Sequence, residues 1–408
     1  MIMQPKNSFS VITKLAAIGL VSASMLACAP KDNPTETGDT SIEDTGVEDT
    51  GIEDTGVEDT SVEPAGEAVL QGVVLAADGS PIEGVSIVLS SGEAGQTSES
   101  GRFLFEGLAE ELQTIAVFEK EGMMTTKRIF VVEEGPDRHQ LVTLIERSEG
   151  QEFDSEALEN VRLDLGSNGY LTITPGSLVD ANGNAATGSA TAYLTMINVQ
   201  DRAALRASPG DFKAEMADGS AAWLESFGMS EVLVVDANGE PLSLADGETA
   251  ELAMDIIMPL KGRGEASANI PFLIFDEATG LWIEQGEGST TDWQTYVFPI
   301  DEFGHWNADQ AYNTTCVKVR VEDSSGAGIE DVQVEAMGLD YTNYYDHFTN
   351  ANGEAYMLVR RDSSLLATVY DDAGNVLGDQ SIVTPNTIGD CAQIEAASGV
   401  SLVGTFSL

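Results

Sequence analysis

Positive charge and histidine are both scarce in this sequence. The 408 residues include 19 Lys and Arg against 68 Asp and Glu, so the formal net charge is −49. A chain this acidic repels nucleic acid and anionic lipid surfaces, and we expect neither as a partner. Zinc carboxypeptidases need a His-x-x-Glu pair and a distant third histidine. None of the three histidines is followed by glutamate at that spacing.

The motifs of other common enzyme classes are also missing. No Gly-x-Ser-x-Gly elbow and no Walker loop occurs in the chain. Carboxylate pairs are uninformative, because among 68 acids such pairs occur everywhere. The sequence therefore predicts a protein that is not an enzyme and that uses no cofactor and no metal ion.

No segment after residue 27 has 18 consecutive apolar residues, the length that a membrane-spanning helix would need. Lys6 and Lys14 precede an apolar or small stretch at 15–27, which is shorter than the ~20 residues of a membrane-spanning helix. A basic start, a short apolar run and small residues before a cut site indicate a secretory signal over residues 1–27.

The end of this signal carries a lipidation motif. Met25-Leu26-Ala27-Cys28 resembles the bacterial lipobox, although leucine is usual where Met25 stands. The resemblance implies that Cys28 carries diacylglycerol and an acylated amine, and several acyl chains anchor a protein stably. We expect a lipoprotein of the cell envelope, on the outer membrane and facing either the surface or the periplasm. The alternative is an ordinary cleaved signal with an incidental cysteine.

Residues 28–66 contain an acidic repeat. Ile42-Glu43-Asp44-Thr45-Gly46 recurs with small changes, at a period of five residues, as far as Ser61. One aliphatic residue in five cannot bury enough surface to offset the cost of ordering, so we expect a disordered, extended linker. Adjacent Glu-Asp pairs also lack the alternating oxygens of a calcium loop.

The rest of the chain predicts an all-β fold of several sandwich domains, of prealbumin-like or Ig-like type. Short strand patterns are separated by glycine-containing turns, and aromatic residues make up only 7% of the chain. Gly79 and Gly101 follow polar residues at turn positions that require positive φ. We expect domains over residues 67–147, 152–310 and 314–408.

The first of these domains has a recognisable pattern. Asp78-Gly79-Ser80-Pro81-Ile82-Glu83-Gly84-Val85, followed by Gly101-Arg102-Phe103, resembles the carboxypeptidase regulatory-like domain. The resemblance implies a seven-stranded sandwich of prealbumin type, also described as a carbohydrate-binding-like fold.

A second copy of this domain is expected at the carboxyl end. Gly326 and Gly353 align with the two turn glycines, but they are 27 residues apart instead of 22. The extra residues fall in the loop 338–346. This copy also lacks the proline and the second glycine of the pattern.

The middle domain resembles another family. Pro209-Gly210-Asp211-Phe212 and Gly304-His305-Trp306-Asn307-Ala308-Asp309 are similar to the central region of cartilage intermediate layer proteins and related bacterial surface proteins. In that family the region adjoins regulatory-like domains, and the resemblance implies no catalytic activity.

Three groups of residues are candidates for special roles. Cys316 and Cys391 are left as a pair if Cys28 carries lipid, and an oxidising compartment favours a disulfide over two separate thiols. The tyrosines of the loop 338–346 could contact a sugar or a protein, or could cap the sandwich edge. For His305 and Trp306 we favour a packed tryptophan with hydrogen-bonded neighbours over a ligand site. The possible ligand-binding residues are Tyr341, Tyr344, Tyr345, His305 and Trp306.

These observations favour a non-catalytic envelope lipoprotein. It would act as a structural, adhesive or protein-interaction scaffold, held at the membrane by its lipid and engaging an envelope protein. A carbohydrate-binding surface protein is the alternative, and an accessory subunit of an envelope enzyme is a second one.

Overall fold

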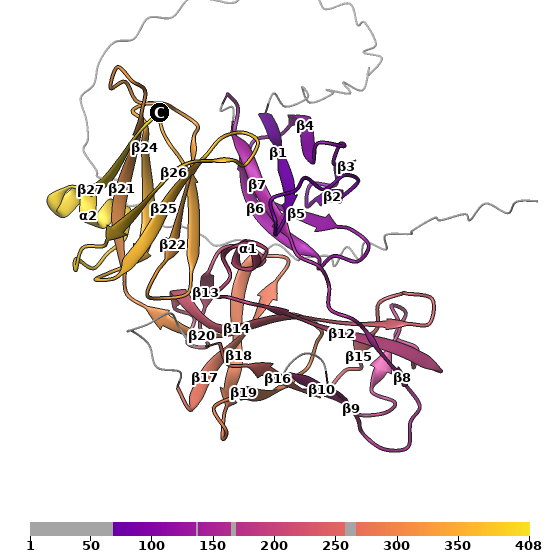
Figure 1. The fold of residues 1–408 in the computed structure, drawn as a ribbon. Helices are drawn as coiled ribbons and strands as arrows, with labels where there is room; N and C mark the ends of the chain where they lie inside the picture. Colours follow the sequence, from indigo (N-terminus) through magenta and orange to yellow (C-terminus); the bar gives the residue numbers. More distant parts are fainter. Residues whose placement is uncertain (1–67, 136–137, 165–168, 258–266) are drawn as a thin grey trace, which may run out of the picture. The chain divides into compact units, whose positions relative to one another are not determined.

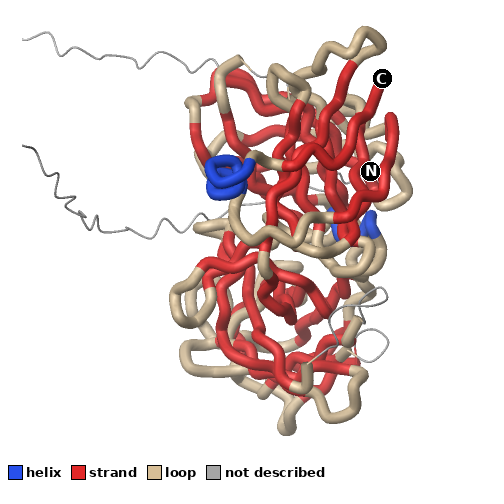
Figure 2. The backbone as a smooth tube through the Cα atoms, turned by 90° about the vertical axis from the view of Figure 1, so that its left-hand side faces the viewer, coloured by secondary structure: helices blue, strands red, loops and turns tan. Residues whose placement is uncertain are grey.

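The computed structural model describes residues 68–135, 138–164, 169–257 and 267–408 (Figure 1). These residues confirm the all-β fold, with helix confined to α1 and α2 (Figure 2). The expected signal at 1–27, Cys28 and the linker at 28–66 lie outside the described residues. The described residues from Ala68 onward belong to one compact unit, in which three β-structures follow one another along the chain.

The first β-structure, which we call the N-terminal sandwich, has two sheets in its described residues, with strand orders β4-β1-β7 and β3-β2-β5-β6. Leu70, Ile87 and Phe118 are almost completely buried between them. This shared apolar core is what holds the two sheets together. The strands are β1 (Ala68–Ala76), β2 (Ser86–Leu89), β3 (Ala94–Gln96), β4 (Arg102–Leu108), β5 (Glu111–Glu119), β6 (Thr126–Val132) and β7 (His139–Leu144).

The C-terminal sandwich repeats this topology. Its sheets have the orders β24-β21-β27 and β23-β22-β25-β26, so each strand has a counterpart twenty places earlier in the numbering. In both sandwiches the first strand pairs in parallel with the last. The elements are β21 (Thr314–Glu322), β22 (Gln333–Gly338), β23 (Tyr344–Phe348), β24 (Glu354–Arg360), β25 (Ser364–Tyr370), β26 (Val376–Val383), α2 (Cys391–Ser398) and β27 (Ser401–Ser407).

Individual hydrogen bonds recur in the two sandwiches as well. The Thr97 hydroxyl donates to the Ile82 carbonyl oxygen at 2.7 Å, and the Thr349 hydroxyl donates to the Ile329 carbonyl oxygen at the same distance. Because these contacts join turns that are distant in sequence, they fix the same loop arrangement in both copies. The two sandwiches are therefore repeats at the level of the backbone.

The glycine that the second copy lacks is replaced by an aspartate in the same conformation. Gly84 has φ +65°, and Asp331 at the equivalent place has φ +55°. The backbone of this turn is thus preserved, although a side chain in the left-handed region is unfavourable.

One type of turn recurs along the chain. At Asp180–Asn184, the Asp180 N–H donates to the Asn184 carbonyl, and the Gly183 N–H donates to the Asp180 carbonyl. Gly183 has φ +79°, which glycine adopts without strain. The Asp180 carboxylate accepts bonds from Asn184 and from the backbone N–H of Asn182, and these bonds hold its pKa below the ordinary value. The same backbone pattern occurs at 236–240, 323–327 and 371–375.

The central structure is a long sheet that curls around its own core. In the described residues its order is β8-β12-β14-β20-β17-β18-β19-β16-β10-β9, with β13 paired to β14 and β18. Phe153 on β8 and Leu163 on β9 belong to the same apolar cluster, although these strands end the order at opposite sides. The middle region is therefore a rolled sheet, with the small pair β11-β15 beside it.

The bounds of the central elements follow the chain. They are β8 (Gln151–Asp154), β9 (Val161–Asp164), β10 (Tyr170–Ile173), β11 (Leu178–Val179), β12 (Ser189–Ile197), α1 (Arg202–Arg206), β13 (Lys213–Glu215), β14 (Ala221–Asp236), β15 (Ser243–Leu244), β16 (Ala250–Asp255), β17 (Asn269–Asp276), β18 (Leu281–Ser289), β19 (Thr295–Ile300) and β20 (Gly304–Tyr312).

Alanine substitutions at two glycines distinguish the cost of backbone strain alone from the cost of strain combined with a steric clash. A Cβ at Gly183 would meet nothing within 4 Å, whereas one at Gly353 would lie 2.2 Å from the Val321 carbonyl oxygen. Both glycines have positive φ. We expect Gly183→Ala to lower the free energy of unfolding by about 1 kcal/mol. Gly353→Ala should cost several times as much, as measured by urea denaturation. Equal losses would contradict the clash.

Candidate functional site

Basic side chains join the three β-structures. Among the described residues, six Lys or Arg side chains pair with a carboxylate that belongs to a different β-structure. This is a large share of a chain with 19 bases in all. We call the three contact regions seams. The pairs are Lys127–Glu277, Arg128–Asp346, Arg138–Asp331, Arg147–Glu231, Arg206–Glu335 and Arg360–Glu225.

The seam between the central sheet and the C-terminal sandwich contains a buried ion pair. Glu225 on β14 has a side chain that is 3% exposed, and it bonds to Arg360 at the end of β24. Burial raises the pKa of Glu225, and Arg360 opposes that rise. The guanidinium also lies 5.9 Å and 5.8 Å from the ring centroids of Tyr312 and Tyr341. One arginine therefore holds a carboxylate and two rings together.

The tyrosine loop is part of this seam. Tyr341 is 2% exposed and Tyr344 5%. The ring of Tyr344 packs edge-on against Phe212 of the central structure, and that of Tyr345 packs against Trp223. Two of the three tyrosines expected to bind a ligand, Tyr341 and Tyr344, are therefore buried in this seam, and Tyr345 is half-buried.

Backbone bonds fix the same loop. The Ser226 N–H donates to the Thr342 carbonyl oxygen at 3.0 Å, and the Asn343 amide donates to the Leu224 carbonyl oxygen at 2.7 Å. The residues that distinguish the second sandwich from the first thus make direct contacts with β14.

A buried carboxyl group lies close to this seam. Asp309 on β20 is fully buried, and no described residue makes a well-directed hydrogen bond to either of its carboxyl oxygens. Burial raises its pKa well above the ordinary value, the nearby Glu225 adds to the rise, and Ser226 opposes it. Burial of this kind favours the protonated form of a carboxyl group over the ionised form.

The seam between the N-terminal sandwich and the central sheet is centred on Glu231. Arg147 contacts both of its carboxylate oxygens, at 3.1 Å and 3.4 Å, and the Thr125 N–H donates to it at 3.2 Å. His305 Nε2–H donates to the Thr125 carbonyl oxygen at 3.0 Å, which assigns the tautomer because a carbonyl only accepts. Burial lowers the pKa of His305 to about 3, and Lys127 contributes. His305 is therefore a neutral structural residue here.

Trp306 packs inside the central sheet. It is fully buried, its ring stacks on Phe272 with centroids 4.4 Å apart, and its Nε1–H donates to the Glu302 carbonyl oxygen at 3.2 Å. Neither His305 nor Trp306 lines an open site. The packed tryptophan that the sequence favoured agrees with this geometry.

An apolar cluster connects all three β-structures. Met124 comes from the N-terminal sandwich, Met337 and Tyr344 come from the C-terminal one, and the rest belong to the central structure. The fully buried Phe212 and Trp282 are its largest central members. Burial of this shared surface stabilises the seams together with the ion pairs.

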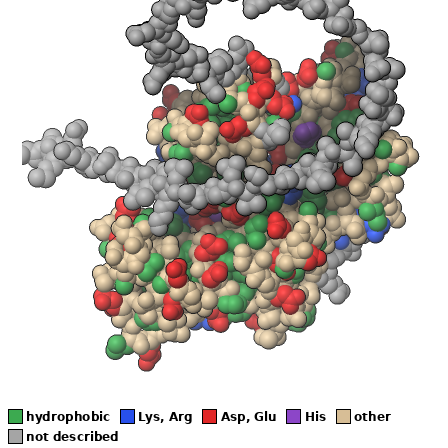
Figure 3. Space-filling view, turned by 180° about the vertical axis from the view of Figure 1, so that it is seen from behind, with side chains coloured by type: hydrophobic (Ala, Val, Ile, Leu, Met, Phe, Trp, Pro, Cys, Tyr) green, Lys and Arg blue, Asp and Glu red, His purple; other side chains and the backbone are tan. Residues whose placement is uncertain are grey.

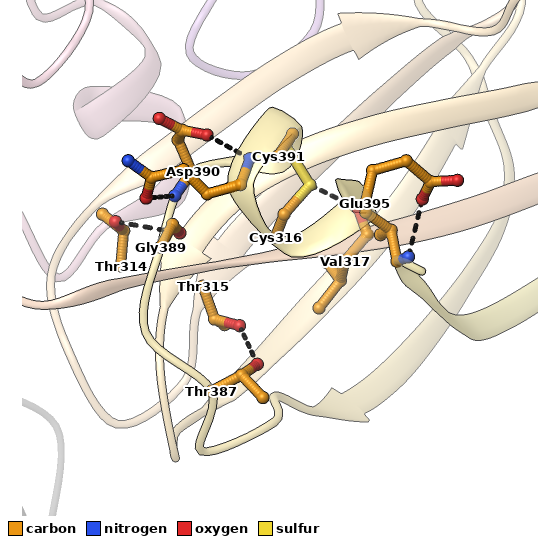
Figure 4. The surroundings of a disulfide bond; sticks show 11 residues. Thr314, Thr315, Cys316, Val317, Thr387, Gly389, Asp390, Cys391 and Glu395 are labelled. Atoms are coloured by element: carbon orange, nitrogen blue, oxygen red, sulfur yellow. Dashed lines mark hydrogen bonds between the residues drawn. A yellow bond between two sulfur atoms is a disulfide. The ribbon is translucent and has the colours of Figure 1, made fainter. Parts of the chain in front are cut away.

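The paired cysteines lie in the C-terminal sandwich, where α2 packs beside β21 (Figure 4). Cys316 on β21 and Cys391 at the start of α2 form a disulfide across 75 residues of sequence, with Cα atoms 4.8 Å apart. The side chain of Asp390 accepts a bond from the Gln393 N–H at 2.7 Å and begins the helix. The bond thus ties the first strand to the helix that precedes the last.

Within the described ranges no group of three or more His, Cys, Asp or Glu side chains could hold a metal ion. Acidic side chains are spread over the face shown in Figure 3, and basic ones are few there. In the part of the chain that the structure describes, no helix is long and apolar enough to cross a membrane.

Sequence reasoning missed the seam residues. Glu225 and Arg360 lie in segments without a motif, and the one available signal is composition: a chain with so few bases tends to use each of them in a contact. Trp293 was also missed, although an apolar residue inside a polar turn stands out in Thr-Thr-Asp-Trp-Gln. Cys28 lies outside the described residues, and its lipidation stays a prediction.

Comparison with known proteins gives distant similarity only. No protein-family model and no curated protein matches the chain. A solved structure of the Bacillus anthracis TIE protein is 10% identical, with 84% of this chain and 50% of that chain covered and a TM-score of 0.19. This chain thus spans half the length of that protein.

Two pilins are similar to the same degree. BcpA, the major pilin subunit of Bacillus cereus, is 10% identical, with 83% of this chain and 98% of that chain covered and a TM-score of 0.18. The full-length major pilin SpaD from Corynebacterium diphtheriae is 10% identical, with 85% and 98% covered and a TM-score of 0.18. At TM-scores this low, the similarities support no functional conclusion.

The disulfide gives a direct test of the C-terminal sandwich. A cross-link over 75 residues restricts the unfolded chain, and its loss typically costs about 2–5 kcal/mol. We expect Cys316→Ser with Cys391→Ser to lower the melting temperature, and dithiothreitol to lower that of the natural chain equally. Free-thiol titration should show the pair as unreactive before reduction. Two reactive thiols would contradict the bond.

His305 gives a test at acidic pH. The folded chain keeps the imidazole neutral down to about pH 3, while the unfolded chain takes up a proton near 6.5. The stability that His305 confers is therefore complete above pH 6.5 and is lost as pH falls towards 3. Between pH 7 and 4, we expect the natural chain to lose about 3 kcal/mol more than His305→Gln in urea denaturation. Parallel pH profiles would contradict a buried neutral His305.

Proposed function

We propose that this chain is a non-catalytic scaffold of the cell envelope, with a structural or adhesive role. The observation that carries the proposal is the set of three seams. Three β-structures share an apolar cluster and are joined by charged pairs whose members are largely buried. Such joints suit a protein whose task is to hold a fixed arrangement, because relative movement would expose unpaired charges.

The proposed attachment is a lipid at Cys28. The lipobox-like sequence supports it, and the acidic linker at 28–66 would separate the folded unit from the membrane. The proposed site is the outer membrane, with the folded unit facing the surface or the periplasm. An envelope protein is the proposed partner, and the similarity to regulatory-like domains and to cartilage intermediate layer proteins is compatible with this role.

The seams can be tested by calorimetry. We expect the natural chain to unfold in a single calorimetric transition, because the seams couple the three β-structures. In Arg360→Ala, the C-terminal sandwich should unfold in a transition of its own, separate from that of the other two β-structures. Removing Arg360 leaves Glu225 buried without its partner, at a cost of about 3–5 kcal/mol. Arg162→Ala is the matched control, because its pair with Asp164 is exposed. Independent transitions in the natural chain would refute a rigid scaffold.

The attachment needs a separate experiment. Mass spectrometry of the mature amino terminus should find an acylated cysteine at position 28, and protease treatment of whole cells should show which side of the membrane the folded unit faces. An unmodified terminus that begins elsewhere would leave a secreted scaffold without an anchor.

A further inference from the structure

A single tryptophan is presented to solvent at the turn between β18 and β19. Trp293 is 51% exposed, whereas Trp282 and Trp306 are fully buried. Trp223 is half-buried, between Lys213 and Tyr345. An exposed ring of this size loses the free energy that burial would supply. Single exposed apolar side chains are common on protein surfaces, so the case for a role of Trp293 depends on the turn that carries it.

The turn holds this ring in an unfavourable backbone conformation. Trp293 has φ +59°, one of three non-glycine residues with positive φ in the described chain. A bulky side chain rarely adopts this region, and such residues concentrate at functional sites. A glycine or asparagine would fit the turn with less strain, yet the sequence has a tryptophan there, the largest of the amino acids.

Hydrogen bonds fix the turn under the ring. The Asp292 carboxylate accepts from the backbone N–H groups of Gln294 at 2.9 Å and Thr295 at 3.2 Å. The Trp293 N–H donates to the Thr290 hydroxyl at 3.0 Å. The bonds that Asp292 accepts hold its pKa below the ordinary value, and the bond from the Gln294 N–H is the largest cause. The ring is therefore carried on an ordered turn between two paired strands.

The residues next to Trp293 in the turn are polar. Thr291, Asp292 and Gln294 are exposed, and in the described chain no other large apolar side chain of this turn is exposed. An aromatic face with exposed hydroxyl and amide groups beside it in the turn matches a ligand with an apolar face bordered by hydroxyl groups.

We propose that Trp293 is the stacking platform of a binding site for neutral polysaccharide. The C–H face of a hexose ring would lie on the indole, and Thr291 and Gln294 would bond to its hydroxyl groups. This goes beyond a scaffold role, because it gives the molecule a ligand.

Charge decides between this ligand and others. Asp292 lies next to the ring in a chain with net charge −49, so uronate- or sulfate-bearing sugars and anionic membranes are repelled. Insertion into a lipid surface or a protein–protein contact would require a wider apolar patch around the ring, whereas the adjoining residues of the turn are polar and exposed. A neutral sugar fits both the ring and its surroundings.

The test uses the purified full-length chain on an array of neutral and anionic oligosaccharides. We expect binding to neutral hexose or N-acetylhexosamine oligomers, then a change in tryptophan emission when the bound hexasaccharide is titrated. Trp293→Gly removes the ring and relieves the positive φ, so it should melt no lower than the natural chain and bind at least about tenfold more weakly. Leu158→Ala, at another exposed apolar residue of the central structure, should bind normally.

Several results would overturn the proposal. These are an array with no neutral sugar bound, equal affinity of Trp293→Gly and the natural chain, or capture of an oligolysine peptide or neutral-lipid vesicles through Trp293 in place of sugars. None of them affects the scaffold proposal, which depends on the unfolding of the seams.

Discussion

Scarcity of positive charge is the constraint on which this structure depends. With 68 acids and 19 bases, most carboxylates have no basic partner and must remain in water. A carboxylate can be buried only where a base, hydrogen bonds or a retained proton compensates the loss of hydration. Glu225 and Glu231 each bond to an arginine from another β-structure, and burial raises the pKa of Asp309 well above its ordinary value, which favours its neutral form. Burial of charge therefore coincides with the places where the β-structures meet.

The two sandwiches show how a repeat acquires different contacts. Their strand orders and the bonds of Thr97 and Thr349 are the same, so the core of each copy depends on the same backbone. They differ in the loop between β22 and β23, where the longer second copy contains Tyr341 and Asn343. That loop packs on β14. A longer loop that leaves the sandwich core unchanged thus adds contacts to its interface with the central sheet.

The same physical reasoning distinguishes the aromatic residues. Tyr341 lies in the loop before β23 and Tyr344 is the first residue of that strand, and a neighbouring structure covers both. Trp293 is on a short turn and is exposed. Rigidity comes from the seams and the disulfide, while recognition is assigned to a turn that takes part in neither. A scaffold with an exposed sugar-binding turn is consistent with both sets of contacts.

The sequence by itself determined the local features. Positive φ at Gly79 and Gly101 follows from turn chemistry, and the spacing of the turns indicates β-strands, because both depend on neighbouring residues only. The tertiary structure decided which surfaces are covered. β14 begins at Ala221, and most of its first half is buried without the alternation that would mark a strand in the sequence. Burial depends on residues far apart in sequence, so the seams and the exposure of Trp293 appear only in the folded chain.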